Sequence, residues 1–94
     1  MHILQIEHGV RDFDAWKKAF DGDPVGREAG GVRGHRVSRP TDDPNRAVID
    51  LEFDSSGEAE AFVVKLRELW GRVGDDLGLE GPQGRILEVV ESKP

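Results

Sequence analysis

Residues 47–73 read AVIDLEFDSSGEAEAFVVKLRELWGRV, and this stretch decides the fold. Its first seven residues place apolar side chains on one face and mainly polar ones on the other, which is typical of a strand with one face in the core. Ser55 and Glu58 then form the pattern of a capping box, which predicts that a helix begins there. The apolar positions that follow have the period of an amphipathic helix, and they are Ala59, Phe62, Val63, Leu66, Leu69, Trp70 and Val73.

The part of the chain before this stretch predicts another strand and another helix. Residues 2–8 alternate around Leu4 and Ile6, as expected for a half-buried strand. Asp12 stands where an N-cap is expected, and a helix over residues 13–21 follows it. The apolar positions of this helix recur at helical spacing, and they are Phe13, Trp16 and Phe20.

Two further strands complete the chain. After a glycine-rich loop, residues 33–39 predict a strand, and turn-forming residues at 40–45 join it to the strand at 47–53 as a hairpin. A connection that contains glycine and proline at 78–84 leads to a last strand over residues 85–91.

The resulting order, β-α-β-β-α-β, predicts one α+β domain over residues 1–94 with a four-stranded antiparallel sheet. Because β-α-β connections are right-handed, both helices are expected on one face of the sheet, in a ferredoxin-like arrangement. The other face is left open. On that open face the first and third strands carry Gln5, Glu7, Val48, Asp50 and Glu52. On the fourth strand the candidates for the same face are Ile86, Glu88 and Val90.

A second copy of the chain is the expected cover for this open face. A chain of 94 residues builds only a thin core, because a domain of this size buries about 60 to 65% of its unfolded surface. The carboxylates on the face then need partners, since a buried unpaired charge costs several kcal/mol. We expect Arg33, Arg36 or Arg85 to neutralise them. The sequence therefore predicts a homodimer, with a solvated sheet face on a monomer as the alternative.

The composition excludes several classes of function. A net charge of −6 argues against a nucleic-acid partner and against an anionic membrane surface. The chain has no cysteine, so disulfides, thiolate metal sites and a cysteine nucleophile are excluded. His2 and His8 are roughly 20 Å apart along a strand, and Asp42 and Asp43 belong to ordinary turn chemistry, so no metal site is predicted. The sequence shows no export signal or apolar span, and a cytoplasmic location is expected.

Three stretches of the sequence carry a family resemblance. They read VRDFDAWKKAF at residues 10–20, RPTDDPN at 39–45 and IDLEFDSSGEAEAF at 49–62. They resemble small proteins of the dimeric α+β barrel superfamily, which includes antibiotic-biosynthesis-type monooxygenases, haem-degrading enzymes and members of unknown activity. The resemblance extends over nearly the whole chain. It implies a homodimer whose two sheets pack face to face into a barrel, with a substrate pocket in each subunit between the helices and the sheet.

The resemblance also implies which residues form that pocket, for a small hydrophobic or aromatic ligand. The expected wall consists of Trp16, Phe20, Leu51, Phe62, Leu66 and Trp70, with His8 and His35 from strand ends and Arg27 from the loop at the mouth. Arg27 is then a candidate for recognising an anion; the alternative is a solvated ion pair with Glu28 or Asp23. For the aromatic residues the alternative is core packing. A cavity of about 300 Å³ or more favours a ligand pocket, and a filled layer favours a core.

Two functions from different classes remain open. Cofactor-independent oxygenation needs a phenolic substrate, a proton acceptor and an apolar cavity; His35 or His8 is the candidate acceptor, and Trp70 or Arg27 would orient the substrate. Haem degradation fits poorly, because the resemblance implies an asparagine on the first strand, where this chain has Gln5, and a histidine associated with the second helix, where it has none. The other class is a non-catalytic ligand-binding or assembly domain. No cofactor is expected in either case.

Overall fold

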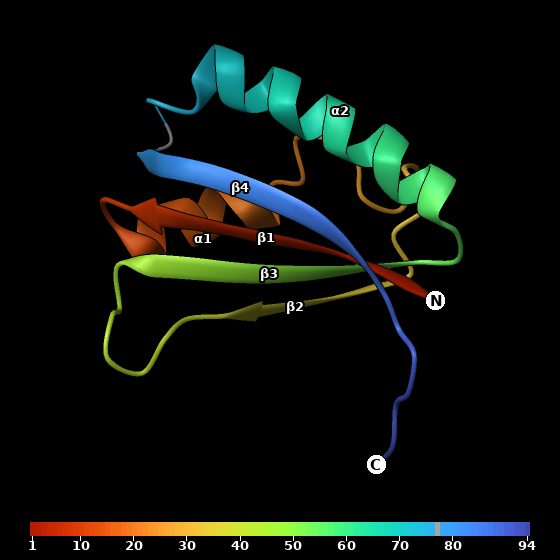
Figure 1. The fold of residues 1–94 in the computed structure, drawn as a ribbon. Coiled ribbons are helices and arrows are strands. Elements are labelled where there is room, and N and C mark those ends of the chain that lie inside the picture. Colours follow the sequence, from red (N-terminus) through yellow and green to blue (C-terminus); the bar gives the residue numbers. More distant parts are fainter. Residues whose placement is uncertain (77) are drawn as a thin grey trace.

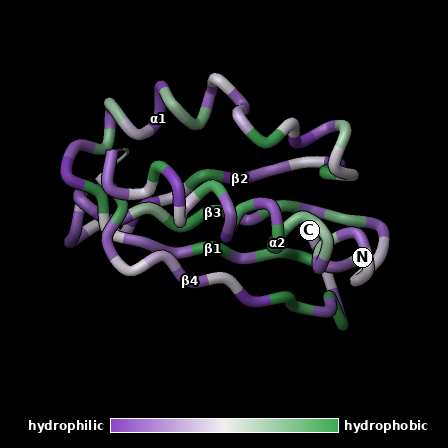
Figure 2. Tube along the Cα trace, turned by 90° about the horizontal axis from the view of Figure 1, so that it is seen from above, coloured by the Kyte–Doolittle hydropathy of each residue, from purple (hydrophilic) through white to green (hydrophobic). Residues whose placement is uncertain are grey.

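The six elements occur in the order that the sequence predicts. A computed structural model describes residues 1–76 and 78–94, with β1 (His2–Val10), α1 (Phe13–Asp21), β2 (Gly34–Ser38), β3 (Arg46–Phe53), α2 (Ser56–Val73) and β4 (Leu79–Glu88). The sheet has the strand order β2-β3-β1-β4, and every neighbouring pair is antiparallel. Both helices lie on the same side of the sheet (Figure 1; Figure 2). The predicted βαββαβ arrangement is thus confirmed.

Both helices begin where the capping patterns predict. Ahead of α1, the Asp12 carboxylate accepts a hydrogen bond from the Ala15 amide at 3.2 Å. Ahead of α2, the Ser55 hydroxyl accepts one from the Glu58 amide at 3.2 Å and donates to the Glu58 carboxylate at 3.3 Å. The amides of a first helical turn have no partner inside the helix, so these side chains determine where each helix starts.

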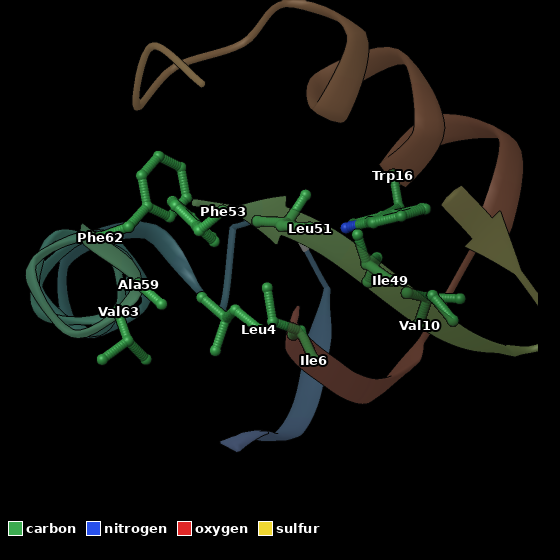
Figure 3. Close-up of a cluster of buried hydrophobic side chains, with 11 residues drawn as sticks. Leu4, Ile6, Val10, Trp16, Ile49, Leu51, Phe53, Ala59, Phe62 and Val63 are labelled. Atoms are coloured by element: carbon green, nitrogen blue, oxygen red, sulfur yellow. The ribbon is translucent and has the colours of Figure 1, made fainter. Parts of the chain in front are cut away.

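The core lies between the sheet and the helices. Along β1 the inward side chains of Leu4, Ile6 and His8 are buried, while the residues between them are half-buried. Figure 3 shows Trp16 of α1 and Phe62 of α2 pointing towards this layer. The inward residues of β3 are also all buried, and they are Ala47, Ile49, Leu51 and Phe53. The alternation of both strands therefore predicted their buried faces correctly.

The fourth strand begins earlier than predicted, because residues 78–84 are mostly strand and not a connection. Between Glu7 and Gly9 of β1 the pairing with β4 shifts by one residue, which leaves one extra residue of β4 in a bulge. Gly81 lies at this place with a φ of 56°, a conformation that glycine adopts without strain. Pro82 beside it lacks a backbone N–H, which is tolerated at a bulge of an edge strand.

The residues of β4 that were predicted to lie on the open face of the sheet lie elsewhere. Ile86 pairs with Leu4 and packs against the core, and Glu88 pairs with His2 on the same side, so neither lies on the open face. Val90 lies beyond the end of β4. The residues of β4 on the open face are instead Gln83, Arg85 and Leu87. Both alternating sets of this segment contain apolar residues, so the hydrophobic pattern does not choose between them.

Polar side chains on the open face form contacts within the subunit. Arg46 bonds the Glu7 carboxylate at 2.5 Å. Arg85 donates two hydrogen bonds, of 2.7 and 3.1 Å, to the amide oxygen of Gln5. The Gln5 amide nitrogen in turn donates to Asp50 at 3.1 Å. A row of hydrogen bonds therefore runs across β4, β1 and β3.

The expected partners of the open-face carboxylates are only partly correct. Arg85 reaches Asp50 through Gln5 and not directly. Arg36 lies opposite Asp50 on β2, but no ion pair joins them within the described residues. Arg33 instead pairs with Asp54 at 2.9 Å, at the end of β3, because it precedes the strand in which it was expected.

Candidate functional site

A cavity lies between the two helices and the sheet. Its wall is formed by β1, β3, α1, α2, the first residue of β4 and the loop after α1. The cavity has a volume of about 90 Å³ and is open to solvent on one side. Most of the wall is apolar, and its titratable residues are His8, Asp23 and Arg27. These three side chains are therefore the ones that can give the cavity chemical specificity.

The structure brings nearly all of the predicted pocket residues together at this cavity. Its wall contains Trp16, Phe20, Arg27, Leu51, Phe62, Leu66 and Trp70, and His8 lines it as well. His35 is the exception, because it is exposed on the edge strand β2 and is not part of the wall. Its ring meets the edge of Phe20 at 5.4 Å between centroids. Whether these residues bind a ligand stays a prediction.

The volume of the cavity is smaller than the 300 Å³ or more expected for a ligand pocket. Trp16 of α1 points into the layer between the helices and the sheet and is only 7% exposed (Figure 3). An enclosed cavity of about 150 Å³ is enough to hold benzene. We therefore expect a ligand with one aromatic ring to extend into the opening or to displace a lining side chain.

A stack of aromatic rings connects α1 to the cavity. Phe13, Trp16 and Phe20 follow one another along α1 with ring centroids 5.5 and 5.4 Å apart. The guanidinium of Arg39 lies 4.6 Å from the Phe13 centroid, and that of Arg27 lies 3.9 Å from the Phe20 centroid. Cations are attracted to the faces of aromatic rings. The stack thus has an arginine at each end, and only Arg27 belongs to the cavity wall.

His8 is the buried polar residue of the wall. Its side chain is 2% exposed, and its ring meets Trp16 edge-on at 5.3 Å between centroids. Burial lowers the pKa of His8 below its usual 6.5; the nearby Arg46 acts in the same direction, and the hydrogen bond to Gly9 opposes them. Near neutral pH the imidazole is therefore uncharged.

The hydrogen bond of His8 also decides which ring nitrogen carries the proton. Nδ1 lies 3.1 Å from the carbonyl oxygen of Gly9. Because a carbonyl oxygen only accepts hydrogen bonds, Nδ1 must be the donor in the neutral ring. Nε2 is then unprotonated, and it has no hydrogen-bond partner among the described residues. This nitrogen can accept a proton or a hydrogen bond from a molecule in the cavity.

Arg27 is held in place at the cavity by several contacts. Its Nη1 donates to the carbonyl oxygen of Phe20 at 2.8 Å, while its guanidinium stacks on the ring of the same residue. The carboxylate of Asp23 accepts a hydrogen bond from the Arg27 amide at 2.9 Å and lies 3.6 Å from Nη1. The expected alternative, an ion pair with Asp23, is thus present as a long contact. The Arg27 side chain remains only 20% exposed.

The wall also contains residues that the sequence patterns did not identify as pocket residues. Ile6 and Ile49 point inward by the alternation of their strands, so the signal for them was available. No periodic pattern places Asp23 in the wall, because the path of its loop depends on a contact with α2, which is far away in the sequence. In that loop, a Cβ on Gly30 would lie 2.5 Å from the ring of Phe62, so only glycine lets the backbone approach α2 this closely.

Two further properties concern the part of the chain that the structure describes. Residues 1–76 and 78–94 contain no group of three or more histidine, cysteine, aspartate or glutamate side chains placed to hold a metal ion. Neither helix is long and apolar enough to cross a membrane.

No protein-family model matches this sequence, and no curated protein matches it. The fold is nevertheless similar to that of several solved structures. A candidate antibiotic biosynthesis monooxygenase from Nitrosomonas europaea has a TM-score of 0.71 and 17% identity, with 95% of this chain and 89% of the other covered. A mutant of MhuD with two manganese protoporphyrin IX molecules bound per active site has a TM-score of 0.70 and 14% identity, with 98% of both chains covered.

A third similar structure is a dimeric ferredoxin-like protein from an uncultured marine organism. Its TM-score is 0.66 and its identity 13%, and the match covers 99% of this chain and 97% of the other. At such low identity the likeness establishes the fold and leaves the function open. This chain therefore has the ferredoxin-like βαββαβ fold that its sequence predicted, and it shares this fold with these solved structures.

Proposed function

We propose that this chain works as a homodimer and that each subunit binds one small, largely apolar molecule in the cavity between the helices and the sheet. The environment of His8 supports this most strongly. It is an uncharged imidazole of defined tautomer in the wall of a cavity that is otherwise mainly apolar. Nε2 of this ring is free to accept a hydrogen bond, which a hydroxyl group on a ligand in the cavity would donate.

The composition of the open sheet face supports the homodimer. This face carries three half-buried apolar side chains, Ile3, Val48 and Leu87, next to the hydrogen-bonded row that includes Gln5 and Asp50. On this face Arg46 pairs with Glu7, and Asp50 and Arg85 form hydrogen bonds with Gln5. Charged groups with such partners lose less on burial than charged groups without any. One protein of similar fold is itself described as dimeric.

The enzymatic form of this proposal is a cofactor-independent monooxygenase-like activity on a phenolic substrate. In such a reaction the anion of the substrate supplies the electrons that reduce dioxygen, so that a proton acceptor at the phenol is the main requirement. His8 has the properties of this acceptor, because Nε2 is unprotonated near neutral pH. One protein of similar fold is described as a candidate antibiotic biosynthesis monooxygenase.

The small volume of the cavity favours a second function, a non-catalytic assembly domain. With about 90 Å³ of space, the aromatic side chains of α1 and α2 come close to filling the layer between helices and sheet. In that case Trp16 and Trp70 serve only as core residues, and the open sheet face is the functional surface.

Titration calorimetry with three phenols distinguishes the two functions. Phenol and hydroquinone have one ring, and we expect them to bind at least about tenfold more tightly than 1,4-dihydroxynaphthalene, because a second fused ring needs more room than a cavity of about 90 Å³ offers. The substitution Ala19→Leu adds bulk to the cavity wall and should abolish binding, whereas Ala61→Leu on the exposed side of α2 should not. If none of the phenols binds the unmodified protein, ligand binding is ruled out for this class and the assembly domain is favoured.

Oxygen uptake tests the enzymatic form separately. With hydroquinone as substrate, His8→Gln should lower the rate of uptake about a hundredfold, the size expected for the loss of a proton acceptor. His35→Gln is the matched control, because His35 lies outside the cavity and should not affect the rate. Uptake that is absent from the unmodified protein, or equal in both variants, would remove the oxygenase and leave binding to be judged by calorimetry.

A further inference from the structure

The cavity wall contains two polar positions of different character, and together they indicate a class of ligand. We propose that the ligand is a single-ring hydroxylated aromatic carboxylate, with its carboxylate bound by Arg27 at the mouth of the cavity and its hydroxyl group at His8. This inference rests on the proposed function, because it assumes that the cavity binds a ligand, and it adds the chemical identity of that ligand.

Arg27 has the features of an anion-binding side chain. Its side chain is half-buried, with 20% exposed. Only Nη1 is engaged, by the carbonyl oxygen of Phe20 at 2.8 Å, and neither Nε nor Nη2 has a hydrogen-bond partner among the described residues. A guanidinium presents its N–H groups in a planar fork that matches the two oxygens of a carboxylate. The unused side of the fork is therefore suited to such a group.

The contacts of Arg27 also keep it in position before a ligand arrives. The ring of Phe20 supports the guanidinium at 3.9 Å, and the ring is in turn stacked on Trp16 with an angle of 23° between the planes. A side chain that is already ordered loses little conformational entropy on binding. The same cation on a mobile surface side chain would bind a carboxylate more weakly.

Asp23 is the obvious competitor for Arg27, since its carboxylate also belongs to the wall. Its Oδ1 atom lies 3.6 Å from Nη1, which is beyond hydrogen-bond distance, and is occupied by the backbone amide of Arg27 at 2.9 Å. The Asp23 side chain is 37% exposed, so water screens its charge. It therefore neutralises the half-buried guanidinium only in part.

The size and the arrangement of the cavity limit the body of the ligand to one ring. About 90 Å³ is less than the roughly 150 Å³ of an enclosed cavity that holds benzene, so we expect the ring to share the opening. Arg27 is a wall residue whose side chain is 20% exposed, and it can meet an anionic group of such a ligand. His8 contacts Trp16 and Arg27 contacts Phe20, and these rings belong to successive turns of α1. The two polar positions thus lie against neighbouring rings, which suits a molecule with polar groups at opposite ends.

Calorimetry with three matched probes tests the ligand class. 4-Hydroxybenzoate and 4-hydroxybenzamide have nearly the same shape and differ in charge, and benzoate lacks the hydroxyl group. We expect 4-hydroxybenzoate to bind about tenfold more tightly than the amide, because a hydrogen bond to a charged group is stronger than one between neutral groups. Benzoate should also bind more weakly than 4-hydroxybenzoate. Added salt should weaken the binding of the carboxylates and leave the amide unaffected.

Two arginine variants assign the preference to one side chain. Arg27→Gln should reduce the affinity ratio of 4-hydroxybenzoate to 4-hydroxybenzamide to about one. Arg39→Gln should leave the ratio unchanged, because Arg39 also stacks on a ring of α1 but lies outside the cavity wall. Thermal unfolding of both variants shows whether they fold. If Arg27→Gln does not fold, the salt dependence and the ratio in the unmodified protein decide.

The possible results separate this inference from the proposed function. Equal affinity for the acid and the amide in the unmodified protein would overturn the carboxylate and leave a cavity that binds neutral rings. A ratio that is the same in Arg27→Gln and Arg39→Gln would overturn the assignment to Arg27. Equal affinity for benzoate and 4-hydroxybenzoate would overturn the contact at His8. If none of the three probes binds, both this inference and the binding function for single-ring ligands are wrong.

Discussion

His8 differs from the other inward residues of β1, because Leu4 and Ile6 on the same face are aliphatic. An imidazole at this position is compatible with burial only as long as it stays uncharged, since a buried cation without a partner costs several kcal/mol. The Gly9 carbonyl satisfies Nδ1, and Arg46 near by makes a positive charge on the ring still less favourable. The same features leave Nε2 unprotonated near neutral pH, as the proton acceptor of the proposed oxygenase requires.

These properties predict a pH dependence of stability. The pKa of His8 is lower in the folded state than the 6.5 of the unfolded state, so the unfolded state binds more protons between these two values. The contribution of the uncharged imidazole is therefore fully present above pH 6.5 and is lost as the pH falls towards the lowered pKa. We expect the free energy of unfolding in urea to decrease more from about pH 8 to about pH 5 in the unmodified protein than in His8→Gln.

The exposed histidine provides the control for this experiment. His35→Gln should retain the pH dependence of the unmodified protein, because His35 is exposed at the edge strand and has no such burial. A decrease that is equal in His8→Gln and the unmodified protein would show that other groups titrate in this range and that His8 contributes nothing.

At the scale of elements, the loop after α1, which supplies part of the cavity wall, packs closely against helix α2. The backbone of Gly30 lies against Phe62, which is 2% exposed in the core and has no room to move away. A methyl group on Gly30 would approach the ring to 2.5 Å. Gly30→Ala should therefore lower the free energy of unfolding by about 1 to 3 kcal/mol, the usual cost of overpacking, and weaken ligand binding.

Gly71 is the matched control for Gly30. It lies within α2 on the exposed side, and a Cβ there would meet nothing within 4 Å. Because alanine favours a helix more than glycine does, Gly71→Ala should raise the free energy of unfolding by about 0.5 to 1 kcal/mol. Chemical unfolding of both variants measures the difference. Equal effects of the two substitutions would mean that the loop does not pack against Phe62 as closely as the structure shows.

At the scale of the whole molecule, the open face of the sheet is the surface that a second subunit would cover. Val48 lies in β3 on this face, opposite Glu7 of β1. An aspartate at position 48 would place like charges on neighbouring strands and a further charge in the interface. Sedimentation of the unmodified protein at micromolar concentration should give twice 10.4 kDa, and Val48→Asp should shift the mass towards that of the monomer.

A valine on the opposite side of the molecule provides the control. Val64 on α2 is 53% exposed, and Val64→Asp should leave the dimer intact. A monomer mass for the unmodified protein would contradict the homodimer at once. A dimer that persists in Val48→Asp but dissociates in Val64→Asp would place the interface on the helices and not on the sheet.

Part of the cavity was predictable from the sequence because its residues obey local periods. Trp16, Phe20, Phe62 and Trp70 lie on the inward faces of two amphipathic helices, and the family resemblance pointed to the layer beneath them. The sequence did not predict that one of the two histidines is buried and the other exposed. His8 is buried and His35 exposed, although both lie in strands, because β1 is central in the sheet and β2 is an edge.

The order of the elements, the starts of both helices and the inward faces of β1 and β3 were determined by the sequence itself. Each of these depends on interactions between residues a few positions apart, such as the hydrogen bonds of Asp12 and Ser55. Only the tertiary structure decided the bulge and the facing of β4, the volume of the cavity and the placement of Arg27 over Phe20. For β4, the hydrophobic pattern fits either face of the sheet equally well, and packing selects one of them. For the cavity and Arg27, the deciding contacts join elements that are far apart in the sequence, so only the packed structure fixes them.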